Sequence, residues 1–204
     1  MENRLFYIIR HGETEFNKLG IVQGSGVDMP LNQLGIDQAQ KFYKHYKEIK
    51  FNKIYTSSLI RTYQSVLPFI EAGYTYEAVP ALNEISWGIY EGKPQNEVER
   101  KVYGEVVKSW NTGNYSARIL AGESALDLQL RQSAFVQYLK QQTDECVLIA
   151  MHGRALKCFL CNLLELPLSE MDSFEHRNLC LYVLEFDGNK FSIIKNCDIT
   201  HLMS

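Results

Sequence analysis

Short apolar runs separated by amphipathic stretches divide the chain into predicted strands and helices. Residues 5–9 and 146–151 are apolar throughout, as expected of strands that are covered on both faces of a sheet. The turn Asp187-Gly188-Asn189 between two further apolar stretches predicts a hairpin near the end of the chain. The predicted strands cover residues 5–9, 53–56, 74–79, 146–151, 179–186 and 191–196.

Apolar residues at helical spacing fill the intervals between these strands. The stripe at residues 39–46 marks the buried face of one helix, and Asn32 is placed to cap its start. We expect Ser57 or Ser58 to cap the next helix. The predicted helices cover residues 33–50, 59–72, 96–111, 125–142 and 153–166. Strands that alternate with helices of this length predict a three-layer, doubly wound α/β fold. Its sheet would be mostly parallel, with helices on both faces and the hairpin as an antiparallel edge.

Length and composition favour one globular domain over residues 1–204. Hydrophobic residues make up 46% of the chain and charged residues 22%, which are ordinary values for a globular protein. The net charge of -3 gives no basic footprint for nucleic acid. No apolar run approaches the ~18 residues of a membrane-spanning helix, and the first residues lack the regions of a signal peptide. We therefore expect neither a nucleic-acid nor a membrane partner.

The five cysteines are odd in number and lie mostly in apolar segments, which favours reduced, buried thiols and a cytoplasmic location. Cys158 and Cys161 form a C-x-x-C, but no second pair or nearby histidine completes a zinc site. A redox pair is expected at the start of a helix, whereas these two fall inside one. We interpret them as core residues. An exposed sheet edge or the hairpin is compatible with a homodimer, but nothing in the sequence requires one.

Two of the predicted strands end in a histidine followed by a glycine. The strand at 5–9 runs into Arg10-His11-Gly12, and the strand at 146–151 runs into His152-Gly153. Ligands of open α/β sheets bind beyond the carboxyl ends of the strands, so both imidazoles are expected there if the two strands are neighbours. Arg61 lies in the first turn of a predicted helix, where free N–H groups also favour anions.

Each of these residues has an ordinary explanation when it is taken alone. A His-Gly pair is usually only a turn, and an arginine such as Arg61 is most often a solvated helix residue. Their joint occurrence at the ends of predicted elements is what indicates chemistry. Two guanidinium and two imidazole groups suit a dianionic phosphoryl group, because guanidinium forks match phosphate oxygens in pairs.

Further motifs in the same order resemble those of the histidine phosphatase superfamily, which includes the phosphoglycerate mutases. R-H-G-E-T at residues 10–14 is followed by Asn17 and Gln23-Gly24, as in the family signature. Residues 30–39 resemble the family's P-L-x-x-x-G-x-x-Q-A segment, and residues 57–65 resemble the segment with its second phosphate-binding arginine. Leu82-Asn83-Glu84, then Gly88, Glu91 and Gly92, resemble the loop with the catalytic acid, and Gly122-Glu123-Ser124 precedes a helix as in the family. The resemblance spans nearly the whole chain.

This resemblance implies a role for each matching residue. His11 would attack phosphorus in line and form a phosphohistidine, while Arg10, Arg61 and a protonated His152 would hold the phosphoryl oxygens. Glu84 would protonate the leaving oxygen and then activate water. No metal and no cofactor are expected, because the cationic side chains would neutralise the phosphoryl charge. The implied substrate-binding residues are Arg10, Asn17, Gln23, Gly24, Arg61, His152 and Gly153.

Other polar and aromatic residues are less well defined by the motifs. Glu13 and Glu91 fit purely structural roles as well as functional ones. Arg154 either adds a cation near the distal end of the substrate or faces solvent. Three histidines match no motif position and are expected on the surface or in structural positions: His45, His176 and His201. Four residues are expected at the pocket rim, of which the last two fit the core equally well: Tyr90, Lys93, Tyr103 and Trp110.

The segment at residues 93–122 bears on the reaction. The family's mutases usually carry a longer, basic insertion there, so its absence favours a phosphomonoester hydrolase acting on a small phosphorylated metabolite. The alternatives are a cofactor-dependent phosphoglycerate mutase and a non-catalytic member that binds phosphorylated ligands. A binding module would be free to lose the implied catalytic residues, which are all present here. The G-x-S-x-G and P-loop motifs of other hydrolases and NTPases are absent.

Overall fold

A single mixed sheet organises the protein. The computed structural model describes residues 3–203, so residues 1–2 and 204 of the predicted domain lie outside the described part. The strand order is β3-β2-β4-β1-β5-β6; β3, β2, β4 and β1 are parallel, β5 pairs antiparallel with β1, and β6 pairs antiparallel with β5. The strands are β1 (Arg4–Arg10), β2 (Lys53–Thr56), β3 (Tyr76–Ala78), β4 (Cys146–Met151), β5 (Leu181–Phe186) and β6 (Phe191–Asp198).

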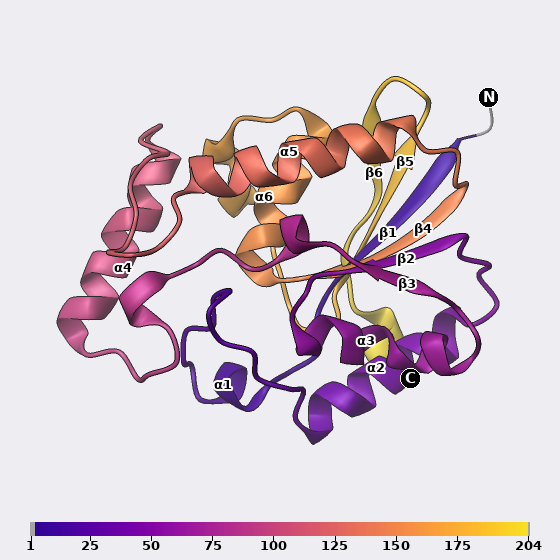
Figure 1. Ribbon diagram of the computed structural model, residues 1–204, viewed down its shortest axis with the longest axis horizontal. Helices are drawn as coiled ribbons and strands as arrows, with labels where there is room; N and C mark the ends of the chain where they lie inside the picture. The colour runs from indigo at the N-terminus through magenta and orange to yellow at the C-terminus, as the bar shows by residue number, and fades with distance from the viewer. Residues whose placement is uncertain (1–2, 204) are drawn as a thin grey trace.

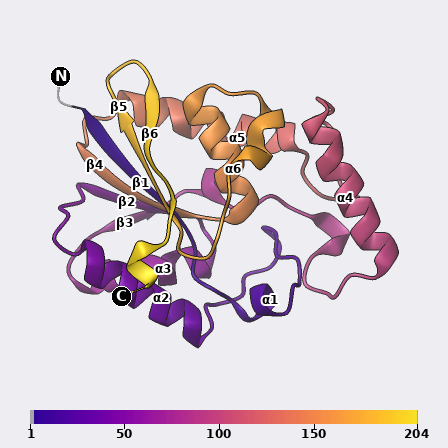
Figure 2. The same ribbon diagram turned by 180° about the vertical axis from the view of Figure 1, so that it is seen from behind.

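Helices cover both faces of the sheet. α2 (Gln33–Tyr46) and α3 (Ile60–Glu71) lie on one face, and α5 (Ala125–Gln141) and α6 (Gly153–Leu164) lie on the other, in both views (Figures 1 and 2). Successive strand residues serve different faces: Leu148 packs into the core under α2 and α3, and Ile149 into the core under α5 and α6. The predicted three-layer α/β architecture with an antiparallel edge is confirmed.

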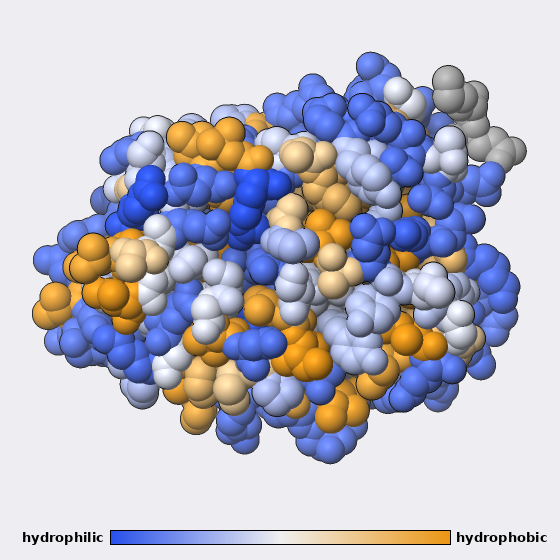
Figure 3. Space-filling view, viewed as in Figure 1, coloured by the Kyte–Doolittle hydropathy of each residue, from blue (hydrophilic) through white to orange (hydrophobic). Residues whose placement is uncertain are grey.

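The remaining elements lie near the carboxyl ends of the strands. They are α1 (Glu15–Lys18), α4 (Glu97–Asn111) and the 3-10 turns Pro80–Leu82, Gly88–Tyr90, Leu168–Ser173 and Thr200–Leu202. In Figure 1, α4 lies to one side of the three layers, beyond these strand ends. Polar residues cover most of the face seen in Figure 3, with apolar residues in separate groups. Within residues 3–203, no helix has the length and apolar character needed to cross a membrane.

Helix starts follow the sequence at α2 but not at α3. Asn32 caps α2 by accepting the Gly35 N–H at 2.9 Å, as predicted. The prediction for α3 was wrong, because neither Ser57 nor Ser58 caps it and Leu59 occupies the cap position. The first free N–H of α3, from Ile60, donates to Asp28 Oδ1 at 2.7 Å, so a residue from a distant loop satisfies it.

The register of the central strands sets the level at which the polar residues emerge. Arg10 pairs with Met151 across β1 and β4, and Thr56 pairs with Ala150 across β2 and β4. Because these three strands are parallel neighbours, the residues that follow them lie at one edge of the sheet. Those residues are His11, His152 and Ser57.

Candidate active site

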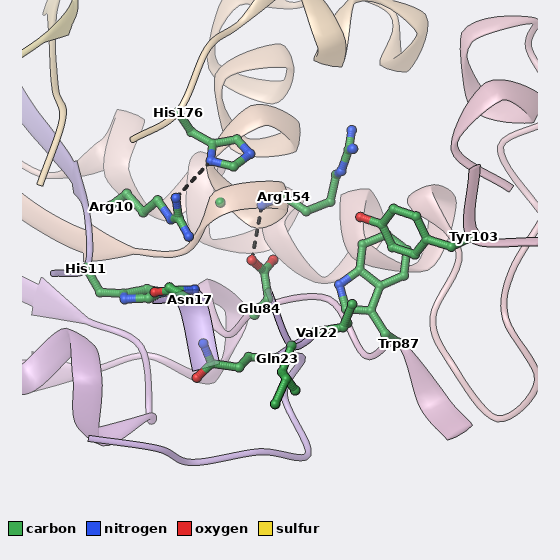
Figure 4. Close-up of a pocket in the computed structure, with 12 residues that line it drawn as sticks. Arg10, His11, Asn17, Val22, Gln23, Glu84, Trp87, Tyr103, Arg154 and His176 are labelled. Carbon is green, nitrogen blue, oxygen red and sulfur yellow. Dashed lines mark hydrogen bonds between the residues drawn. The ribbon is translucent and has the colours of Figure 1, made fainter. Parts of the chain in front are cut away.

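The carboxyl ends of β1 and β4 open into a cavity of about 160 Å³. The loop after β1, the segment around Glu84, α4 and the segment before β5 surround it (Figure 4). Of the predicted site residues, Gly24, Arg61 and His152 are not in the wall but are buried near it. The wall is formed by Arg10, His11, Asn17, Ile21, Val22, Gln23, Glu84, Trp87, Tyr103, Gly153, Arg154 and His176.

His11 is held as a neutral imidazole, and among residues 3–203 its Nε2 has no hydrogen-bond partner. Its Nδ1 lies 2.7 Å from the carbonyl oxygen of Gly12, which can only accept, so Nδ1 carries the proton and Nε2 keeps its lone pair. Burial and the nearby Arg61 and Arg10 cations lower the pKa of His11 well below its usual value. At neutral pH Nε2 is therefore available as a nucleophile.

Gly12 brings the backbone after His11 against the start of α2. A Cβ at Gly12 would lie 2.7 Å from the carbonyl oxygen of Gly35, so no other residue fits without moving α2. The Gly12 N–H donates to the hydroxyl of Ser65 at 2.9 Å, which joins the same turn to α3. The turn that carries His11 is thus fixed between two helices.

His152 is fully buried beside His11, with 5.2 Å between the ring centroids. Its Nδ1 accepts from Arg61 Nε at 3.1 Å, so its proton is on Nε2, which lies 2.7 Å from Ser57 Oγ. Burial, followed by Arg61, His11 and Arg10, lowers the pKa of His152 well below its usual value. The ring is thus neutral in this structure, whereas the protonated form expected from the sequence depends on a nearby phosphate dianion, which would raise the pKa of the ring.

Arg61 is fixed by acceptors on all sides. Besides His152, its guanidinium donates to the carbonyl oxygens of Val27 at 2.7 Å and Gly24 at 3.2 Å. Burial lowers its pKa to about 10, against the opposing effect of Glu84, so it remains a cation at neutral pH. Gly24 therefore contributes to the site through its carbonyl group, which helps to hold the Arg61 guanidinium.

Glu84 points into the cavity from the segment after β3. Its Oε1 accepts from the N–H groups of Ile85 at 2.9 Å and Ala155 at 2.8 Å, and its Oε2 accepts from the Arg154 N–H at 3.1 Å (Figure 4). Two of these donors belong to the first turn of α6, whose free N–H groups favour a carboxylate. The side chain is 7% exposed and has one fixed orientation.

Arg131 of α5 holds the main chain of the same segment, although no sequence motif indicates this residue. Its guanidinium donates to the carbonyl oxygens of Ala81, Asn83 and Glu84 at 2.7, 2.9 and 3.0 Å. It also binds both oxygens of Glu123 at 2.8 and 3.1 Å. Glu123 belongs to the Gly122-Glu123-Ser124 motif, but nothing in the sequence indicates that it pairs with Arg131.

Glu91 and Glu13 make structural contacts. Glu91 accepts from the N–H groups of Trp87 at 2.6 Å and Gly26 at 2.9 Å, and so ties the acid segment to the loop after α1. A Cβ at Gly24 would lie 1.9 Å from Glu91 Oε1, which explains the glycine there. Glu13 accepts from Asn32 Nδ2 at 2.9 Å, at the start of α2.

Asn17 and Gln23 form the lower wall of the cavity (Figure 4). Asn17 completes a capping box with Thr14, and Gln23 Nε2 donates to Thr14 Oγ1 at 2.6 Å. Asn178, which the motifs did not indicate, donates from Nδ2 to Asn17 Oδ1 and to the His11 carbonyl oxygen, both at 3.1 Å. The segment before β5 thereby braces the loop after β1.

His176 was expected on the surface or in a structural position, but the structure places it in the cavity wall. Its Nδ1 lies 3.1 Å from Arg10 NH1 (Figure 4). His176 matches no motif position, so nothing in the sequence indicates this contact. Of the other two unassigned histidines, His45 is exposed on α2, and His201 is buried with Nε2 2.9 Å from the Leu179 carbonyl oxygen.

The expected rim residues are mostly elsewhere. Tyr103 lines the cavity, but Tyr90 and Trp110 are buried in the core and Lys93 is exposed and paired with Glu99. Trp110 is fully buried and donates to the Ala117 carbonyl oxygen at 2.9 Å. Tyr103 and Trp110 are seven residues apart and so lie on the same face of α4, and periodicity alone cannot tell a cavity position from a core position.

Arg154 forms part of the distal wall. Its side chain is 11% exposed, lies with its Cζ 5.5 Å from the centroid of a Trp110 ring, and pairs with Asp172 at 2.8 Å. Asp172 also pairs with Lys157 at 3.0 Å. Burial would raise the pKa of Asp172, but the two cations outweigh it and lower the value to about 2. Arg154 is thus in the cavity wall and does not face solvent, which was the other alternative.

The arrangement suits a phosphoryl group. The His11 imidazole, the Arg10 guanidinium and the buried Glu84 carboxylate line one small cavity, and the Arg61 guanidinium is buried near it. Within residues 3–203 there is no cluster of three His, Cys, Asp or Glu side chains able to hold a metal ion.

Comparisons with known proteins agree with this geometry. Residues 6–198 match the family model described as "Histidine phosphatase superfamily (branch 1)". A "Probable phosphoglycerate mutase GpmB" of Yersinia pestis is 31% identical over 182 residues, which cover 88% of this chain and 84% of the relative.

Solved structures share the fold over almost the whole chain. The alpha-ribazole phosphatase of Shigella flexneri has a TM-score of 0.84 at 23% identity, with 95% of this chain and 96% of that chain covered. The phosphoserine phosphatase of Entamoeba histolytica, in complex with 3-phosphoglyceric acid, has a TM-score of 0.82 at 24% identity, with 98% and 99% covered. The family match, supported by this shared fold, shows that the chain belongs to branch 1 of the histidine phosphatase superfamily.

Proposed function

We propose that this chain is a phosphomonoester hydrolase that acts on a small phosphorylated metabolite through a phosphohistidine at His11. The observation that carries the proposal is the tautomer of His11, whose Nδ1–H is bound by the Gly12 carbonyl and whose Nε2 is free. A nucleophilic imidazole must be neutral and must present one lone pair to phosphorus. The free thiols of all five cysteines support a cytoplasmic location.

In the first step Nε2 of His11 attacks phosphorus while the bond from phosphorus to the ester oxygen breaks. Glu84 begins this step protonated and gives its proton to the departing oxygen, which leaves as the alcohol. Arg10, Arg61 and His152 hold the three other phosphoryl oxygens, and the two guanidinium groups balance their charge. In the second step Glu84 takes a proton from water and the water oxygen attacks phosphorus while the bond from phosphorus to Nε2 breaks. Inorganic phosphate and neutral His11 are released, and Glu84 is again protonated.

Hydrolysis is favoured over mutase activity by the wall that α4 provides. Within residues 93–122, Tyr103 lines the cavity, whereas the cationic side chains of that segment lie outside its wall. Lys93, for example, is bound to Glu99. This segment therefore adds no cation to the cavity wall that could bind the second phosphate of a bisphosphate. The alternative, a cofactor-dependent phosphoglycerate mutase, rests on the 31% identity to the GpmB relative.

The test is release of p-nitrophenol from p-nitrophenyl phosphate in the presence of EDTA. We expect turnover by the parent, loss of turnover in His11→Ala, and retention in His45→Ala, a control at an exposed histidine. Acid-labile phosphate on His11 after rapid quenching would identify the intermediate. Turnover that persists in His11→Ala would reject this function. Turnover of phosphoglycerate only with a bisphosphate primer would favour the mutase, and the absence of both turnover and phosphohistidine would favour a binding protein.

A further inference from the structure

Arg10 and Arg61 differ in how firmly their guanidinium groups are held. Arg61 donates to three fixed acceptors. Arg10 donates from NH1 to Nδ1 of His176, and its Nε is buried with no partner among residues 3–203. A guanidinium group has five N–H donors, so most of those on Arg10 are uncommitted and its orientation depends on His176.

His176 is suited to act as an acceptor. Arg10 can only donate, so Nδ1 of His176 must be unprotonated and the ring proton is on Nε2. Burial, followed by the Arg10, Lys157 and Arg154 cations, lowers the pKa of His176 to about 3, so the ring stays neutral at neutral pH. The ring also packs against Gly153 at the start of α6, where a Cβ would lie 3.1 Å from its Cε1.

The second ring nitrogen of His176 faces the other end of the cavity. Figure 4 shows Nε2 on the side of the ring away from Arg10 and toward Arg154, above the Glu84 carboxylate. His176 is half-buried, and no residue among 3–203 accepts a hydrogen bond from Nε2. The proposed role of Glu84 places the leaving oxygen beside its carboxylate, so Nε2 is on the side of the cavity where the atoms next to the ester oxygen would lie.

On the basis of the proposed function, we propose that His176 has two tasks, one as a positioning residue and one as a specificity-determining residue. Through Nδ1 it directs the Arg10 guanidinium toward the phosphoryl group. Through Nε2–H it selects phosphomonoesters that carry a hydroxyl or carboxylate oxygen on the carbon next to the one bearing phosphate. A substrate of this class fills both ends of the cavity and leaves no polar group of His176 unpaired.

The first test measures binding of inorganic phosphate by calorimetry to the parent, His176→Phe, His176→Asn and the control His45→Phe. Phenylalanine keeps a ring but has no acceptor, whereas the asparagine amide oxygen can accept near the position of Nδ1. We expect His176→Phe to weaken binding about ten- to one-hundredfold, the range for a hydrogen bond to a charged group. His176→Asn should recover most of this loss, and His45→Phe should match the parent. Equal affinity of His176→Phe and the parent, or equal loss in His176→Phe and His176→Asn, would overturn the first task.

The second test compares kcat/KM for glycerol 2-phosphate with that for phenyl phosphate, whose neighbouring atoms are all carbon. Loss of the Nε2 donor in His176→Asn should lower the ratio of the two values about tenfold relative to the parent. An unchanged ratio would overturn the second task. If the parent turns over neither ester, the proposed hydrolysis fails, and the same ratio is taken from the dissociation constants of the two esters. Thermal unfolding of each variant separates these effects from loss of the fold.

Discussion

Replacing Arg131 with methionine should loosen the segment that carries Glu84 while leaving the rest of the cavity intact. The Arg131 guanidinium makes five hydrogen bonds, three to carbonyl oxygens of residues 81–84 and two to Glu123. Methionine retains much of the apolar stem but none of these donors. The Glu84 carboxylate keeps its own backbone donors, so we expect displacement of the segment rather than collapse of the site.

The expected magnitude follows from burial. Each hydrogen bond contributes about 1 kcal/mol net, and breaking a buried ion pair costs roughly 3–5 kcal/mol. Arg131 and Glu123 are 23% and 26% exposed, so water can replace part of the lost contacts. We therefore expect Arg131→Met to lower the free energy of unfolding by about 3 kcal/mol. The value of kcat should fall about tenfold, because the proton donor is less well placed.

Urea unfolding and p-nitrophenyl phosphate turnover measure the two effects. The matched control is Arg118→Met, because Arg118 also pairs with a carboxylate, Asp127 at 3.0 Å, but at 49% and 38% exposure. Such an exposed pair contributes at most about 1 kcal/mol. Arg131→Lys should lie between the two, because it keeps the charge but not the fork. A loss in Arg131→Met within 1 kcal/mol of that in Arg118→Met would refute the reasoning.

Three further predictions concern the acid, the glycine loop and pH. Glu84→Gln should lower kcat about a hundredfold or more for glycerol 2-phosphate. The loss should be smaller for p-nitrophenyl phosphate, because its leaving group needs no proton. Equal losses for the two esters would contradict the role of Glu84 as a general acid. Gly24→Ala places a Cβ 1.9 Å from Glu91 Oε1 and should destabilise by about 2 kcal/mol in urea unfolding, whereas Gly104→Ala meets no atom within 4 Å and should not destabilise. The buried histidines of the site have lowered pKa values, so the unfolded chain binds protons that the folded chain does not. Stability is thus fully present above pH ~6.5 and is lost as pH falls below it. The loss is about 1 kcal/mol for each histidine between pH 7.5 and 5.5, and an unfolding free energy that stays constant over this range would exclude it.

Much of the fold could be predicted because it depends on local patterns. The apolar run of β4 matched the observed bounds Cys146–Met151, and Asn32 caps α2 as its position before an amphipathic stretch predicts. Both signals are carried by residues within one element. Errors occurred where a distant residue replaces a local one, as when Asp28 rather than Ser57 or Ser58 satisfies the start of α3. The Ser57 hydroxyl instead accepts from Leu59 N at 3.1 Å and binds His152.

The candidate site follows the same division. By itself the sequence determined that His11 and His152 each follow a buried strand and that Arg61 begins a helix, since strand ends and helix starts leave local signatures. Only the tertiary structure decided that β1 and β4 are neighbours, that His176 contacts Arg10 and that Arg131 holds the Glu84 segment. Those contacts join residues 47 to 166 positions apart. Such pairs have no local signature, because hydrogen-bond partners are chosen by the packing of whole elements.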